Sequence, residues 1–300
     1  MCERSRCMGF VLSCALGVWS APPAMADVGV TVRHSREGVL AGELLLTHPS
    51  FVEGSVGTFS PGPASWSGAS ASATDSMEDA PSGAVSSQRL RSFTIAGEND
   101  PGSDPESAFA FARSSSQWMA PAGAAFVQVE FLSDGQLGAL RDRVDALMQA
   151  NINISGQLSQ GSESRATNYA FTVTATTPAA PGIEPESSIG VNFGPAGTFD
   201  PPVIAGGSGG VWNVSVTLRL MIAIDPTMPF DVVMSTESLA SAFNGVGAAA
   251  ANFGATTELR LTALDSEQTP IDASFTYVPT PSAAALLACA GLFGFLRRRV

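Results

Sequence analysis

Apolar and polar residues alternate along several segments of the chain, as they do in strands that bury one face. The longest such segment runs from Trp212 to Ile224, where every second residue is apolar. We expect its even-numbered positions from 212 to 222 to be buried, and we predict that it forms a central strand. Shorter alternating segments occur at 28–32, 127–131, 151–155, 169–174 and 258–261.

Half-polar strands of this kind are typical of antiparallel sheets, since the strands of parallel sheets are buried on both faces. Gly- and Pro-rich connections between many strands favour two packed sheets. We therefore predict a mainly β fold for residues 27–277, an antiparallel β-sandwich resembling a jelly roll. Residues 134–149 depart from the alternation, because their apolar residues recur at helical spacing, and a capping box is formed by Ser133 and Gln136. They predict one short amphipathic helix that covers a sheet edge.

Two segments are low in sequence complexity. Residues 60–88 are mostly Ser, Ala, Gly and Pro, which predicts either a loop or a strand whose core face is only Ala. Residues 177–210 are rich in Gly and Pro and are long for a loop within one domain. A division of the body into two subdomains at this segment is therefore one interpretation.

The composition narrows the class of protein. Charged residues make up 14% of the chain, against roughly 25% in an ordinary domain. Fifteen arginines face 27 acidic residues, so the net charge is −12, which argues against a partner with a phosphate backbone. With 45% apolar residues, the chain is also unlike a highly charged disordered protein.

The N-terminus has the features of a secretory signal peptide over residues 1–26. Arg4 and Arg6 precede a mostly apolar run, and the small residues Ala24 and Ala26 precede Asp27. We expect cleavage between Ala26 and Asp27, which requires the export machinery as a partner. The alternative is a lipoprotein box that ends at Cys14, although the apolar run before it is short.

The C-terminus, residues 278–300, has the features of a second sorting segment. Val278, Pro279, Thr280 and Pro281 precede an apolar run at 282–296. That run predicts an apolar helix separate from the body, because it has no polar face, and at about 22 Å it is short for a bilayer core of about 30 Å. The basic residues that close the chain favour the cytoplasmic side, so the body would lie outside. They are Arg297, Arg298 and Arg299.

This tail resembles the PEP-CTERM sorting signal of Gram-negative-type bacteria. Pro279 and Pro281 match the two prolines of the family's motif, Thr280 stands where Glu is usual, and Arg297 to Arg299 match its basic cluster. The resemblance implies that an exosortase-like enzyme recognises the tail and removes it. It also implies a localisation: membrane-anchored through the tail before processing, and at the cell surface or outside the cell afterwards.

Removing both terminal segments changes the net charge and the cysteine content of the remaining body. Five arginines and one glutamate leave, so ten arginines face 26 acidic residues and the charge is −16. All four cysteines also leave, so the mature body has no disulfide and must rely on burial for stability. Such a body touches the membrane only through its tail and suits an extracellular setting.

Candidate sites for chemistry are few. The two histidines, His34 and His48, form no metal motif and are interpreted as surface or strand-end residues, and no catalytic motif is found. Asp100, Asp104 and Glu106 lie in a Pro- and Gly-rich acidic segment that is the best candidate for binding Ca²⁺.

These observations favour a non-enzymatic, surface-sorted protein with a structural or matrix role in an envelope or biofilm. The first alternative is a carbohydrate-binding module for extracellular polysaccharide, with Trp66 as the candidate residue for stacking on a sugar. The second is a secreted hydrolase with paired carboxylates, which the spacing of acidic residues does not identify.

Overall fold

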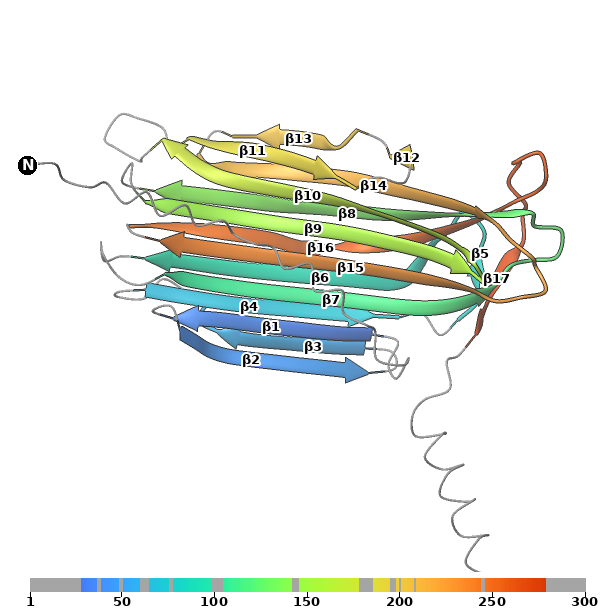
Figure 1. Ribbon diagram of the computed structural model, residues 1–300, viewed down its shortest axis with the longest axis horizontal. Helices are drawn as coiled ribbons and strands as arrows, with labels where there is room; N and C mark the ends of the chain where they lie inside the picture. Colours follow the sequence, from blue (N-terminus) through green and yellow to red (C-terminus); the bar gives the residue numbers. More distant parts are fainter. Residues whose placement is uncertain are drawn as a thin grey trace, which may run out of the picture.

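The computed structural model describes residues 28–278 apart from short gaps, and every regular element in the described residues is a β-strand (Figure 1). The gaps are 37–38, 49–50, 60–64, 76–77, 99–104, 142–145, 178–185, 195–197, 200, 208 and 244–245.

Two antiparallel sheets make up the described body. Sheet A has the order β11 (Glu186–Phe193), β10 (Glu163–Thr177), β9 (Leu147–Gln160), β15 (Phe230–Phe243), β7 (Glu106–Met119), β1 (Val28–Arg36) and β2 (Val39–His48), with β17 (Ser274–Val278) also on β7 and β5 (Ala80–Pro81) on β17. Sheet B has the order β12 (Thr198–Phe199), β14 (Val211–Ala223), β8 (Phe126–Arg141), β16 (Gly247–Leu264), β6 (Val85–Glu98), β4 (Ser65–Thr74) and β3 (Phe51–Gly57), with β13 (Val203–Gly206) on β14. The prediction of a mainly β fold with two antiparallel sheets is confirmed.

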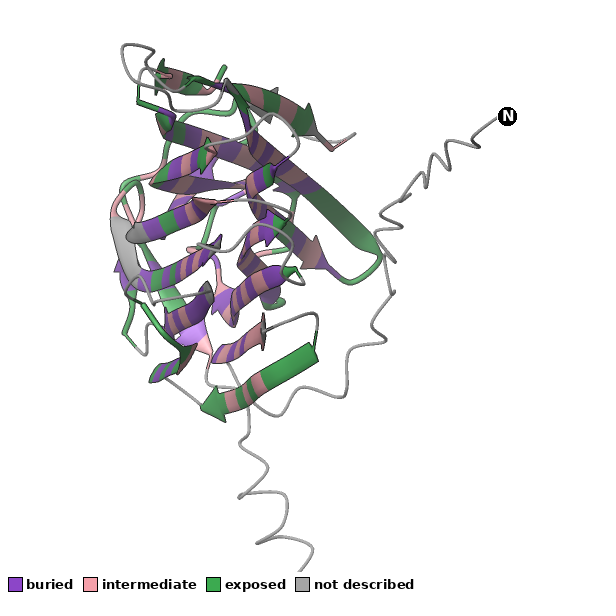
Figure 2. Ribbon diagram, turned by 90° about the vertical axis from the view of Figure 1, so that its left-hand side faces the viewer, coloured by how far each residue is buried: buried purple, intermediate pink, exposed green. Residues whose placement is uncertain are grey.

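Alternation of side chains decides which face of each strand is buried. Along β7 and β15 every second residue is buried against the other sheet, and the intervening residues face outward. Figure 2 shows this alternation as stripes of colour along the strands. The predicted phase of 212–224 is also confirmed, because positions 214 to 222 of β14 are buried at every second residue and Trp212 is half-buried. However, β14 lies beside the short strands β12 and β13, so it is next to the edge of sheet B and is not central.

The predicted helix at 134–149 is wrong. Residues 134–141 complete β8 in sheet B, and 147–149 begin β9 in sheet A. The alternation of apolar and polar residues did not reveal this strand, because Gly135 occupies an inward position, where a Cβ would come within 2.5 Å of the ring of Phe253. In addition, the apolar Leu140 faces outward. An inward glycine and an outward leucine therefore interrupt the period of two within one segment.

The described parts of 177–210 do not form a separate layer. Strand β11 pairs with β10 at one edge of sheet A, whereas β12 and β13 both pair with β14 in sheet B. Near this edge the Nε1–H of Trp212 donates a hydrogen bond to Ser187 Oγ at 2.7 Å and so joins the two sheets. Near the opposite edge, Ser67 Oγ of sheet B donates to the backbone oxygen of Ser35 in sheet A at 2.7 Å.

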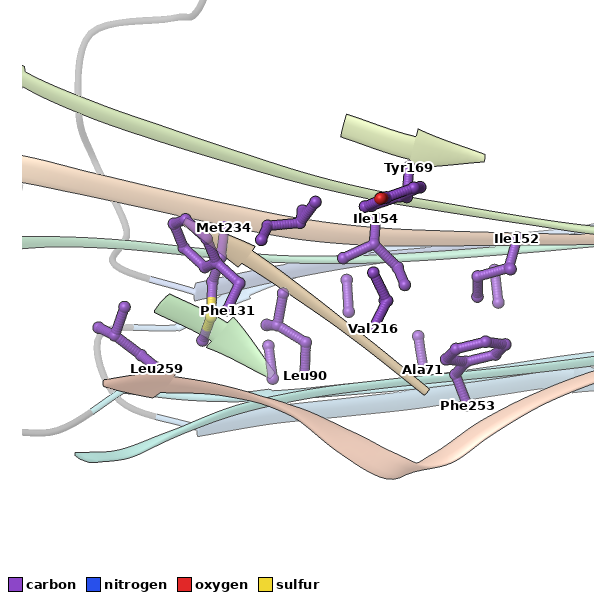
Figure 3. Packing of buried hydrophobic residues seen from close by; sticks show 14 of the residues in the cluster. Ala71, Leu90, Phe131, Ile152, Ile154, Tyr169, Val216, Met234, Phe253 and Leu259 are labelled. Atoms are coloured by element: carbon purple, nitrogen blue, oxygen red, sulfur yellow. The ribbon is translucent and has the colours of Figure 1, made fainter. Parts of the chain in front are cut away.

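The core has a bulky half and a small half. Large buried side chains fill the space between β8, β9, β10 and β16, as Figure 3 shows for Phe131, Ile154, Tyr169 and Phe253. By contrast, the facing strands β4 and β7 bury mostly alanine and serine. Residues 60–88 therefore include a strand with a small-residue core face, which was one of the two interpretations of their composition.

One glycine in sheet A makes room for an aromatic ring of sheet B. A Cβ on Gly156 of β9 would come within 2.2 Å of the ring of Phe131 on β8, which is fully buried. Neither group can move easily, because a packed core has few voids to receive it. The two sheets are therefore matched in shape at this position.

We predict that Gly156→Ala lowers the free energy of unfolding by about 1–3 kcal/mol, the usual cost of overpacking a core. Gly190→Ala is the matched control, since a Cβ on this strand glycine of β11 would meet only one atom, 3.9 Å away. Urea denaturation of both variants tests the account. Equal stability of the two variants would contradict it.

Candidate functional site

The two ends of the described body meet along one edge of β7. Strand β15 pairs with one edge of β7, so β1 and β17 share the other edge, where β1 lies opposite Ser107 to Ser114 and β17 opposite Gln117 to Met119. Val28, which starts β1, pairs with Ser114, whereas Val278, which ends β17, pairs with Gln117. Three residues of strand separate these partners by about 10 Å. The chain therefore enters and leaves the body at one place.

Strand β17 is anchored in the core up to its last residues. Phe275 is fully buried and packs edge-to-face on Phe230, with ring centroids 5.9 Å apart. Tyr277 packs in the same way on Trp118 at 5.3 Å, and its backbone N–H donates to Asp79 Oδ1 at 3.0 Å. Figure 1 shows β17 beside β5 at one end of the strands. The body is thus closed immediately before the Pro279–Pro281 motif.

Most of the predicted processing residues lie outside the described residues. Val278 is half-buried and ends β17, but Pro279, Thr280, Pro281 and the basic cluster Arg297–Arg299 are not described. The same holds for Ala24, Ala26 and Asp27 at the predicted signal-peptide cleavage, and for the predicted apolar helix at 282–296. Within the described residues, no helix has the length and apolar character needed to cross a bilayer.

The predicted metal ligands are only partly described. Asp100 and Asp104 fall in the gap at 99–104, whereas Glu106 begins β7 and is fully buried. The described residues contain no group of three or more His, Cys, Asp or Glu side chains that could hold a metal ion. His34 and His48 lie far apart, because His34 pairs with Gly42 of β2 and His48 is at the end of that strand.

Trp66 is buried, with 7% of its surface exposed. It lies on the outer face of β4 against Gly97 of β6, where a Cβ would come within 2.1 Å of its ring. Its Nε1–H has no hydrogen-bond partner among the residues that the structure describes. In this position Trp66 offers a ligand little ring surface for stacking.

A groove of about 500 Å³ lies on the outer face of sheet B over β3, β4 and β6. Its floor is β4, whose outward residues here are small, and its walls are formed by larger side chains of the two neighbouring strands. Its lining follows the cross-strand pairs of these strands, in the rows Phe51–Thr74–Arg89 and Glu53–Ser72–Arg91 and the pair Ser70–Phe93. The low-complexity composition of β4 therefore creates the depression.

The groove carries opposite charges on its two walls. Glu53 and Arg91 are exposed and separated by Ser72, which places them about 10 Å apart across two strand spacings. Arg89 pairs with Glu258 at 3.4 Å, outside the lining. Phe93 stacks on Phe59 with ring centroids 5.8 Å apart, which fixes an aromatic surface at one end.

Sequence reasoning missed these groove residues. Their only signal was the run of small residues at 60–88 between segments with Phe and Arg, and that run did not indicate which face would be outward. A second, smaller hollow of about 360 Å³ lies farther along sheet B, beside Asp134, Gln136, Asn213 and Val203. Two of the amides that line it are engaged with each other, since Gln136 Nε2 donates to Asn213 Oδ1 at 2.9 Å.

No protein-family model matches the chain, and comparison with curated proteins and with solved structures finds no significant match.

Glu237, on the outer face of sheet A, has a perturbed pKa. It lies between Phe111 of β7 and Asn153 of β9, and burial raises its pKa above the ordinary value of 4.5. The folded state therefore binds this proton more tightly than the unfolded state. The stability that results is present below pH 4.5 and is lost as the pH rises through the raised pKa.

We predict that Glu237→Gln is more stable than the original chain at pH 7.5 and that this difference disappears near pH 4. The reason is that the amide resembles the neutral carboxyl group and carries no charge to desolvate. Thermal melts at both pH values measure the effect, and Glu163→Gln, at an exposed position of β10, is the control. A Glu237→Gln advantage that is the same at both pH values would show that ionisation is not its cause.

Proposed function

We propose that this chain is an exported, surface-sorted protein whose β-sandwich body has a non-enzymatic structural or matrix role in a cell envelope or biofilm. Within this proposal, residues 1–26 direct export and residues 278–300 form a PEP-CTERM-like tail that an exosortase-like enzyme removes. The observation that carries it is the position of the two ends. Sheet A begins at Val28 and ends at Val278, so both proposed cuts fall just outside the last paired residues.

The shared exit point of the two ends also supports the proposal. Val28 and Val278, the first and last described residues, pair with residues of β7 that lie about 10 Å apart along one edge. Segments that continue from these two residues to one membrane therefore start from the same place on the body. Cutting either segment therefore requires no rearrangement of the sheets.

The charge and packing of the body agree with a location outside the cell. A charge of −16 keeps an exported body hydrated and repels anionic head groups, so attachment depends on the tail. Stability comes from the continuous core between the two sheets, with no cysteine that oxidation could alter.

Deleting residues 279–300 is predicted to release the protein from the cell surface into the medium without changing its melting temperature, because β17 stays complete. Immunoblots of surface and medium fractions, with thermal melts of the purified proteins, measure both effects. The matched control removes residues 274–300 and so also takes away Phe275 and Tyr277.

The control that lacks residues 274–300 is predicted to melt about 10 °C or more below the protein that lacks only 279–300, or to fail to fold. The reason is that burying two aromatic side chains contributes several kcal/mol. Unchanged surface retention after deletion of 279–300 would contradict the sorting role of the tail. A large fall in melting temperature for that deletion would instead make the tail part of the core.

A further inference from the structure

We infer that the groove over β3, β4 and β6 is a binding site for a neutral polysaccharide chain. The inference goes beyond the proposed sorting role, because it concerns a site on the body and does not depend on either terminal segment. It rests on the shape of the groove, its aromatic surfaces and its polar groups.

The shape suits an extended ligand that lies along the strands. From the row of Thr74 to the row of Ser70, β4 runs four residues, or about 13 Å. Because the outward residues of β4 in this stretch are Ser and Thr, no bulky side chain interrupts the floor. The volume of about 500 Å³ lies within the range of small-ligand sites and accommodates a short oligosaccharide segment.

The aromatic side chains stand at diagonally opposite corners of the groove. Phe51 on β3 is 50% exposed, and Phe93 on β6 is held by its stack with Phe59. Flat apolar rings of this kind pack on the C–H faces of sugar rings, and an exposed Phe51 gains from being covered. Two separated rings can contact successive parts of one chain.

The polar groups of the groove are available to a ligand. In the described part of the chain, the side chains of Glu53, Ser70, Ser72 and Arg91 make no hydrogen bond or ion pair with protein. Together they present a carboxylate acceptor, a guanidinium donor and two hydroxyl groups that act as either. This mixture matches the donors and acceptors of sugar hydroxyl groups.

The backbone and the charge of the groove argue against other ligands. Strand β4 is paired with β3 on one side and with β6 on the other, so the floor offers no free backbone groups to an extended peptide. Two arginines are balanced by Glu53 and Glu258, on a body with a charge of −16. A neutral chain rich in hydroxyl groups therefore fits better than a phosphate or a polyuronate.

The groove is equipped for binding and not for hydrolysis of a glycoside. That reaction requires two carboxyl groups on either side of the bond, about 5–10 Å apart. Among the described residues that line the groove, Glu53 is the one carboxylate. We therefore expect retention of the polysaccharide without cleavage.

The test is native affinity electrophoresis of the body, residues 27–278, in gels that contain hydroxyethyl cellulose, galactomannan or polygalacturonate. The double variant Phe51→Ala, Arg91→Ala removes one ring and one donor from opposite walls. The matched control, Phe243→Ala, Arg165→Ala, removes an exposed ring and an exposed arginine from sheet A.

We expect retardation by at least one of the two neutral polysaccharides, weakened at least tenfold in the groove variant and unchanged in the control. No retardation in either neutral gel, retardation by polygalacturonate alone, or an equal effect of the two double variants would overturn the inference. Circular dichroism of each variant identifies loss of fold. If the groove variant unfolds, the single substitution Arg91→Ala at an exposed side chain takes its place, with the same criteria.

Discussion

The contact between the two sheets is the interaction on which the rest of this protein depends. Without cysteines in the body, burial between the sheets supplies the stability, and both sheets must fit each other closely. The fit uses large rings beside glycines in one half, as with Phe131 and Gly156, and alanine-rich strands in the other. Strand β4 also carries small side chains on its outer face, and these leave a groove on the outside of sheet B.

The packing also determines where the chain ends are placed. Strand β7 carries β1 and β17 along the same edge, and Phe275 and Tyr277 fix β17 in the core. In the proposed sorting role, the body is attached and released at this one point, and its groove and its outer faces remain free. The proposed sorting role and the proposed binding site are compatible for this reason.

The sequence predicted the strands whose alternation is uninterrupted, such as 212–224 and 28–32, because a period of two follows directly from one buried face. It failed at 134–149, where an inward Gly135 and an outward Leu140 removed that period. It also could not predict the groove, since Phe51 and Arg91 are 40 residues apart in sequence and reach its opposite walls only through the pairing of β3 and β6 with β4. Trp66 was predicted to stack on a sugar because its neighbours in the sequence are polar. In the structure its ring is buried, because Gly97 has no side chain and the ring packs closely on it.

The central claim is that the mature protein consists of the β-sandwich body, cut on both sides of its paired strands. The most direct measurement is the intact mass of the protein isolated from the cell surface, with peptide mapping of both termini. The account predicts an N-terminus at Asp27 and a C-terminus at or next to residues 279–281, apart from any group added there on transfer. A mature chain that retains residues 282–300, or one that begins with an acylated Cys14, would contradict it.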